Sequence, residues 1–94
     1  MIRSFRGDFA RSILRDRKLP KGFPERIAQV ARRKLVQLDN AAVLSDLAAP
    51  PGNRLEALKG KLSDRHSIRI NDQWRILFRS TRDGPEEVEI VDYH

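Results

Sequence analysis

The chain has 94 residues, of which 39% are hydrophobic and 34% are charged, and its mean hydropathy is −0.59. This length fits one domain over residues 1–94, with enough apolar residues for one core and too few for a second. The absence of cysteine excludes disulfides, thiolate catalysis, iron–sulfur clusters and thiolate zinc sites. No run approaches the roughly 20 apolar residues that cross a bilayer, and no apolar segment follows the amino terminus. We therefore expect a cytoplasmic protein with no secretory signal and no membrane partner.

Basic residues exceed acidic ones, and the excess is confined to the first half of the chain. Nineteen Lys and Arg against thirteen Asp and Glu give a formal net charge of +6, and fourteen of the cations are arginine. Residues 1–50 carry eleven cations and five carboxylates, whereas residues 51–94 carry eight of each. Because the planar guanidinium suits phosphate, this balance favours nucleic acid or an acidic protein as partner. A solvated basic helix face would explain the same excess.

The first half of the chain predicts one strand and two helices. Residues 2–6 alternate apolar and polar side chains, which is typical of a short strand, and Asp8 is a suitable N-cap for the helix that follows. A loop over residues 19–23 leads to a second helix over residues 24–42, with Pro24 in its first turn. The apolar stripe of this helix has helical spacing and consists of Ile27, Val30, Ala31, Leu35 and Leu38.

The second half predicts a sheet. After a turn at residues 43–46 and a proline-rich loop at residues 47–52, strands are expected over residues 54–58, 66–70, 74–80 and 88–93, with a turn at residues 82–85. Helices followed by an antiparallel meander indicate an α+β fold. We expect a small, mostly antiparallel sheet with two N-terminal helices packed on one face.

The alternation of side chains predicts the length of the loop at residues 71–73. A two-residue loop would pair Ile68 with Arg75, whereas a three-residue loop pairs Ile68 with Ile76 and keeps the apolar side chains on one face. We predict the three-residue loop, which places Arg69 directly opposite Arg75 on the other face. Like charges in that position are destabilising. The two guanidiniums either extend into solvent or grip one phosphate or successive phosphates.

Several common chemistries lack their residues. His66 and His94 lie on different predicted elements without metal-ligand spacing, so no metal site is expected. None of the five glycines belongs to a glycine-rich phosphate loop, and no cofactor is expected. Ser63 and Ser67 lack well-placed partners for a nucleophilic triad.

Cations and proton-transfer groups fall on strands or strand ends of the predicted sheet. They are Lys59, Arg69, Arg75, Asp92, Tyr93 and His94. Such a set is suited to cleaving RNA without a metal, because the ribose 2′-hydroxyl supplies the nucleophile. The protein then needs only a proton acceptor, a proton donor and cations for the developing phosphorane charge. Each residue also has an ordinary explanation, such as an ion pair for Asp92 or ring packing for Tyr93.

Three segments closely resemble the HigB toxins of the RelE/ParE superfamily. They are Leu-Lys-Gly at residues 58–60, Ser-Ile-Arg-Ile-Asn-Asp-Gln-Trp-Arg-Ile at residues 67–76, and Val-Glu-Ile-Val-Asp-Tyr-His at residues 88–94. The resemblance implies a RelE-like fold and a type II toxin that cuts messenger RNA in the ribosomal decoding site. It also implies a HigA-like antitoxin with a helix-turn-helix domain, through which alone the toxin would meet operator DNA.

The resemblance also assigns roles to residues. Lys59 matches the lysine of the Leu-Lys-Gly motif, Arg75 matches the arginine after tryptophan, and Asp92, Tyr93 and His94 match the functional terminus. Arg69 joins this catalytic set as a second phosphate-binding arginine. The cations expected to bind RNA are Arg26, Arg32, Arg33, Lys34, Lys61 and Arg79.

Three positions depart from the family pattern. Glu56 stands where some members have histidine, Asn71 stands where some have a basic residue, and Lys61 begins a pair that is acidic-then-basic in the pattern. The departures are compatible with altered substrate preference or reduced activity. Two other functions therefore remain open: a non-catalytic homologue that acts with its antitoxin as a DNA-binding co-repressor, and a gyrase inhibitor like the ParE branch.

Overall fold

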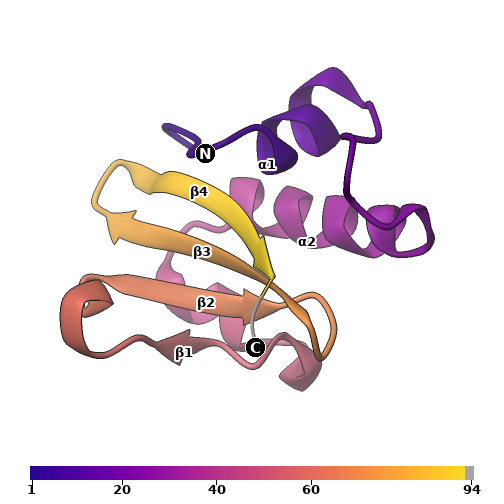
Figure 1. The fold of residues 1–94 in the computed structure, drawn as a ribbon. Coiled ribbons are helices and arrows are strands. Elements are labelled where there is room, and N and C mark those ends of the chain that lie inside the picture. Colours follow the sequence, from indigo (N-terminus) through magenta and orange to yellow (C-terminus); the bar gives the residue numbers. More distant parts are fainter. Residues whose placement is uncertain (93–94) are drawn as a thin grey trace.

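The computed structural model describes residues 1–92 and shows an α+β fold, as predicted. Helix α1 (Phe9–Arg11) continues into a π-helical segment (Ser12–Asp16), and a 3-10 turn (Glu25–Ile27) leads into α2 (Ala28–Asn40). The strands are β1 (Glu56–Ala57), β2 (Arg65–Arg69), β3 (Trp74–Thr81) and β4 (Gly84–Asp92), and the remaining 3-10 helices are Leu44–Ala48, Pro51–Asn53 and Gly60–Leu62. The strands pair antiparallel in the order β1-β2-β3-β4, and α1 and α2 lie on one side of the sheet (Figure 1).

The hydrophobic core lies between the helices and one face of the sheet. Leu35 and Leu38 from the predicted stripe of α2 are fully buried, as are Ile68 and Ile76 from the sheet. Burying a side chain of this size contributes roughly 1.5–3 kcal/mol. The opposite face of the sheet, called the outer face below, carries most of the charged residues of the strands.

The amino-terminal segment does not form the predicted strand. It runs parallel to β4 and makes one isolated bridge, between Phe5 and Val88. Val88 donates its N–H to the Ser4 carbonyl at 3.0 Å, but the preceding N–H, of Glu87, is taken by the Ser4 hydroxyl at 2.8 Å. Glu87 has a φ of 51° where the register of β4 shifts. This irregularity interrupts the ladder and limits the segment to a single bridge.

Asp8 is the N-cap residue of α1, as predicted, but its side chain does not cap the helix. The Asp8 side chain makes no capping hydrogen bond; instead it accepts one from Arg11 at 2.9 Å on the surface. The second helix is shorter than the predicted residues 24–42, because its first turn is 3-10 and the backbone becomes extended at Ala41.

Two strands differ in length from the prediction. The first predicted strand shrinks to Glu56–Ala57, because Arg54 has a φ of 45° and cannot begin an extended segment. The last strand begins four residues earlier than predicted, since Gly84 already pairs with Thr81 across a short turn. Within residues 1–92 no helix is long and apolar enough to span a membrane.

Candidate active site

The β2–β3 hairpin has the predicted three-residue loop and the predicted register. Ile68 pairs with Ile76 and Arg69 pairs with Arg75. The Asn71 side chain fixes the loop, because its Oδ1 accepts hydrogen bonds from the backbone N–H groups of Gln73 at 2.9 Å and Trp74 at 2.7 Å. A loop closed by its own asparagine holds the two arginines in a defined relation.

Arg69 and Arg75, the arginine pair, lie side by side at one end of the outer face. Each guanidinium reaches an acceptor in the hairpin loop: Arg69 forms an ion pair with Asp72, and Arg75 donates to the Asn71 carbonyl. Arg75 also donates to the Trp74 carbonyl at 3.3 Å. These acceptors offset the repulsion of two cations placed directly opposite each other, which explains how the sequence tolerates the pair.

Asp92 lies at the same end of the sheet but on the opposite face. It pairs with Trp74, whose side chain is in the core, whereas Val91 is the residue opposite Arg75. Asp92 Oδ2 accepts a hydrogen bond from Gln73 Nε2 at 3.1 Å, so the end of β4 is tied to the hairpin loop. Tyr93 and His94, the other predicted residues of the terminus, lie outside the described residues.

Lys59 is exposed and lies at the other end of the sheet. It follows β1, where the Leu58 N–H donates to the Arg65 carbonyl at 2.9 Å. Arg65 and Arg69 are separated by four residue steps, or about 13 Å along a strand. The described residues therefore bring Arg69 and Arg75 together, with Asp92 near them, and leave the backbone of Lys59 apart.

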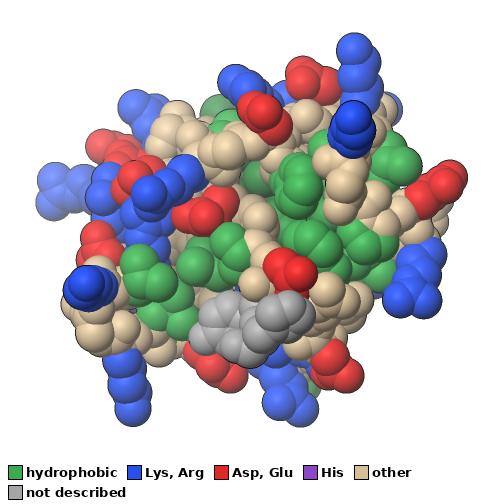
Figure 2. Space-filling model, viewed as in Figure 1, with side chains coloured by type: hydrophobic (Ala, Val, Ile, Leu, Met, Phe, Trp, Pro, Cys, Tyr) green, Lys and Arg blue, Asp and Glu red, His purple; other side chains and the backbone are tan. Residues whose placement is uncertain are grey.

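A second pair of arginines lies on the outer face, surrounded by carboxylates. Arg65 pairs with Arg79 across β2 and β3. Their ionic partners lie within 4.0 Å and are Asp64, Glu86, Glu87 and Glu89. These six residues are called the charged cluster, and mixed blue and red side chains mark the left part of the view in Figure 2, where these strand ends lie. Arg65 was not among the residues predicted from the sequence, although its position opposite Arg79 follows from the same register.

Arg79 is therefore not a free cation for RNA. It forms ion pairs with Glu86 at 2.6 Å and with Glu87 at 2.9 Å. The hydrogen bond to Glu86 raises the pKa of Arg79 further above its ordinary value. A phosphate would have to displace two carboxylates, which disfavours the role in RNA binding predicted for this residue.

The other predicted RNA-binding cations differ in exposure. Arg26, Arg33 and Lys61 are exposed, and Arg32 is partly buried on α2. Lys34 is also partly buried, and its Nζ donates a hydrogen bond to the Arg69 carbonyl at 2.6 Å. Burial, together with the charges of Arg33 and Arg69, lowers the pKa of Lys34. The ammonium of Lys34 thus has a partner inside the molecule.

Comparison with known proteins identifies the family. The family described as the RelE-like toxin of type II toxin-antitoxin system HigB matches residues 3–94. The chain belongs to the HigB-like toxin family. Toxin HigB-1 of Vibrio cholerae serotype O1 is 39% identical to this HigB-like toxin over 79 residues, 84% of this chain and 83% of that protein. An uncharacterised protein of Haemophilus influenzae is 36% identical over 56 residues, 60% of this chain and 55% of that protein.

The family membership confirms the resemblance deduced from the sequence. The HigB-like toxin is a toxin of a type II toxin–antitoxin system, so an antitoxin is its partner. HigB toxins inhibit translation by cutting messenger RNA, which agrees with the activity expected from the sequence. Within residues 1–92 of the toxin, no group of three His, Asp or Glu side chains is arranged to hold a metal ion.

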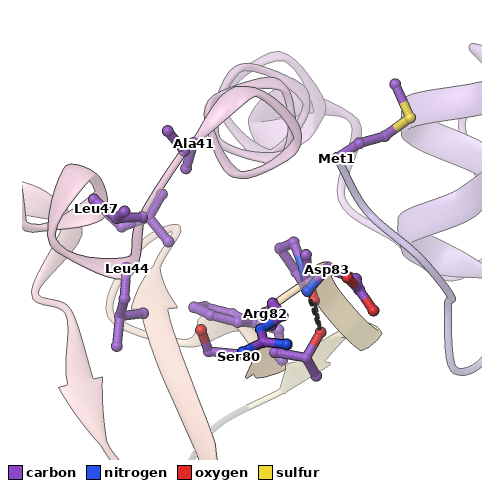
Figure 3. A pocket seen from close by; sticks show the side chains of 13 residues that line it. Met1, Ala41, Leu44, Leu47, Ser80, Arg82 and Asp83 are labelled. Atoms are coloured by element: carbon purple, nitrogen blue, oxygen red, sulfur yellow. Dashed lines mark hydrogen bonds between the residues drawn. The ribbon is translucent and has the colours of Figure 1, made fainter.

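A cavity of about 230 Å³ lies away from the arginine pair. In Figure 3 its lining includes Leu44 and Leu47 on the left and Met1 on the right, with Ser80 and Arg82 from the β3–β4 hairpin below and between them. None of the predicted site residues within residues 1–92 lines it. This cavity is therefore separate from the arginine pair of the HigB-like toxin, which lies at the other end of β2 and β3.

Proposed function

We propose that the HigB-like toxin cleaves messenger RNA on the ribosome without a metal, using the ribose 2′-hydroxyl as nucleophile. In this proposal the arginine pair holds the scissile phosphate and stabilises the charge that develops on it. Lys59 supplies a further cation, which requires its long side chain, or the RNA itself, to span the distance along the sheet.

The observation that carries the proposal is the pairing of Arg69 with Arg75 on the outer face. Two guanidiniums fixed across neighbouring strands present several N–H donors to one phosphate group. Arg69 is held by Asp72, whose side chain is 97% exposed. An exposed ion pair contributes about 0–1 kcal/mol, so a phosphate can displace this carboxylate at little cost.

The proposed reaction needs one proton acceptor and one proton donor. The acceptor removes the 2′-hydroxyl proton, the 2′-oxygen bonds to phosphorus, and the bond from phosphorus to the 5′-oxygen breaks. The donor protonates the leaving 5′-oxygen, so the products are a 2′,3′-cyclic phosphate and a 5′-hydroxyl. Asp92 or His94 is proposed for proton transfer, which for Asp92 requires its side chain to reach the outer face around the end of the sheet. Tyr93 is proposed for stacking on a base or relaying a proton.

The remaining partners are proposed from charge and family. Arg26, Arg32, Arg33 and Lys61 contact ribosomal or messenger RNA, which makes binding sensitive to salt. The antitoxin is proposed to be of the HigA type, with a helix-turn-helix domain that alone contacts operator DNA. The toxin then acts in the cytoplasm, where translation occurs.

Expression of the toxin without its antitoxin tests the proposal. The 5′ ends of cellular transcripts are mapped for the wild type, for Arg75→Ala, and for Arg82→Ala, which removes an exposed arginine from the β3–β4 turn. We expect new cuts within translated messages in the wild type and in Arg82→Ala. Arg75→Ala should lose about 100-fold in cleavage rate, as is typical when one transition-state contact is removed.

Other outcomes would identify the alternative functions. Growth arrest with intact messages would indicate a gyrase inhibitor, and absence of arrest would indicate a non-catalytic co-repressor. Cuts that persist in Arg75→Ala at the wild-type rate would refute the role of the arginine pair.

A further inference from the structure

One hydrogen bond joins α2 to the end of the strand that carries Arg69. Lys34 Nζ donates to the Arg69 carbonyl oxygen at 2.6 Å, across 35 positions of sequence. In Figure 1 α2 lies behind the sheet, so the lysine spans from the helical layer to the end of β2. The contact therefore reaches the backbone of a residue of the arginine pair from the opposite face.

The pairing of the strands explains why this carbonyl lacks a strand partner. In an antiparallel pair, successive residues direct their N–H and C=O groups alternately toward and away from the neighbouring strand. Ile70 donates its N–H to the Trp74 carbonyl, so the polar groups of the preceding residue, Arg69, are directed toward the β1 side. However, β1 pairs only as far as Ser67.

The residue that would continue β1 opposite Arg69 is Arg54. Arg54 has a φ of 45° and donates its N–H to the Pro51 carbonyl at 3.1 Å, so this N–H does not serve the Arg69 carbonyl. A partly buried carbonyl without a donor costs free energy. Lys34 supplies the donor that the shortened strand does not.

The surroundings of Lys34 disfavour a charged side chain. Burial lowers the pKa of Lys34, and the charges of Arg33 on its own helix and Arg69 on β2 lower it further. An uncharged donor such as glutamine would avoid this cost. Residues that are locally unfavourable, as a charged lysine is here, are most often found where function requires them.

We propose that Lys34 is a positioning residue for the arginine pair: it holds the Arg69 carbonyl and thereby fixes the end of β2, so that Arg69 and Arg75 keep their relation across the hairpin. This inference rests on the proposed function. It replaces the direct RNA contact expected of Lys34 from the sequence.

Cleavage kinetics with three variants test the role. Lys34→Met removes the donor and keeps the apolar stem, Lys34→Arg keeps a charged donor, and Lys21→Met makes the same change at an exposed loop lysine. We expect kcat on ribosome-bound message to fall by about 10- to 100-fold in Lys34→Met, because a displacement of about 1 Å costs up to that much. KM should change little, since the exposed cations remain. Lys34→Arg should restore most of kcat, and Lys21→Met should match the wild type.

A measurement without RNA checks the contact itself. The carbon-13 signal of the Arg69 carbonyl should move in Lys34→Met and stay in place in Lys21→Met. In the wild type it should titrate at alkaline pH as Lys34 loses its proton, whereas Lys34→Arg should show no such step because guanidinium stays charged.

The outcomes separate the two proposals. A wild-type protein that does not cleave message refutes the proposed function, and the carbonyl signal still decides whether Lys34 holds the end of β2. If the wild type cleaves and Lys34→Met keeps full kcat, the positioning role is wrong. It is also wrong if kcat falls equally in Lys21→Met or if the carbonyl signal does not respond to Lys34→Met.

Discussion

Arg65 and Arg79 face each other across β2 and β3 and share the carboxylate of Glu87, at 3.1 Å and 2.9 Å. The side chain of Arg65 is only 8% exposed, so its charge depends on protein partners rather than water. This arrangement contrasts with the arginine pair at the other end of the same two strands, where one exposed carboxylate accompanies Arg69. The charged cluster thus has a structural role, whereas the arginine pair is the site at which we propose that phosphate binds.

The first prediction concerns the shared carboxylate. Glu87→Gln keeps the shape of the side chain but removes the charge between two arginines, so we expect a loss of about 1–3 kcal/mol in the free energy of unfolding. Urea denaturation measures it, and the loss should shrink in high salt because salt screens the repulsion. The same change at exposed Glu25 is the control, and equal losses would contradict the shared role of Glu87.

The second prediction concerns Asp72. Asp72→Asn removes the exposed carboxylate that competes with phosphate for Arg69, so RNA binding should strengthen. The gain should reach at most about five-fold in Kd, which corresponds to about 1 kcal/mol for a surface ion pair. Binding of a short single-stranded RNA at fixed salt measures it. Weaker binding in Asp72→Asn would contradict the placement of phosphate at Arg69.

The third prediction separates free cations from paired ones. If exposed Arg33 contacts a phosphate, Arg33→Gln should lower the slope of log affinity against log salt by about 0.7–0.9. Arg79→Gln should leave that slope unchanged, because two carboxylates already neutralise Arg79. Filter binding to ribosomes over a range of salt concentrations measures both slopes. A larger decrease for Arg79→Gln would show that it, and not Arg33, meets the RNA.

The fourth prediction concerns acid stability. Asp39 Oδ1 accepts hydrogen bonds from the Ile2 N–H at 2.8 Å and from Arg15 at 3.2 Å. Burial alone would raise the pKa of Asp39, but these bonds and the charges of Arg15 and the amino terminus hold it below 3.8. A carboxyl with a lowered pKa stabilises the fold above its ordinary pKa, and this contribution is lost as the pH falls through the folded value.

Asp39→Asn should therefore be less stable than the wild type by about 1–3 kcal/mol at pH 7. The difference should shrink as the pH falls below 3.8. Thermal denaturation of both proteins across this range measures the effect, with exposed Asp16→Asn as the control. A difference that does not depend on pH would show that the charge of Asp39 is not the cause.

The fifth prediction concerns Gly84, where the amino-terminal segment crosses the start of β4. Gly84 has a φ of 130°, and a Cβ atom there would overlap the carbonyl oxygen of Met1. We expect Gly84→Ala to cost about 2 kcal/mol or more, since both the backbone strain and the overlap must be relieved. Gly52→Ala, whose Cβ would meet open space, should stay within about 0.5 kcal/mol of the wild type in the same urea titration.

The parts of the fold predicted correctly depend on local patterns. The apolar stripe of α2 and the alternation of side chains between the two faces of the hairpin at residues 68–76 depend on residues close together in the sequence. Both predictions are confirmed. The N-cap position of Asp8 is also confirmed, but its side chain accepts a hydrogen bond from Arg11 instead of capping the helix. The prediction of a strand over residues 2–6 was wrong because the register of β4 shifts at Glu87 and limits this segment to one bridge. Glu87 lies more than 80 residues away, so residues 2–6 alone do not reveal this shift.

In the candidate site, too, features set by local sequence patterns were predicted and contacts between different elements were not. The arginine pair was predicted because register follows from alternation. The internal partners of Lys34 and Arg79 were not predicted, because a hydrogen bond or ion pair between different elements leaves no periodic signal in the sequence. Charge alone could not distinguish a cation that is free from one that is already bonded.

The loop at Asn71, Asp72 and Gln73 has one further consequence. Surface loops usually accept a gained or lost residue, because they lie outside the packed interior. Here an insertion or deletion of one residue would turn Arg75 inward and Trp74 outward, so it would remove the phosphate-binding surface and open the core at once. Length variants of this loop should therefore be the least tolerated changes in the hairpin, whatever residues they contain.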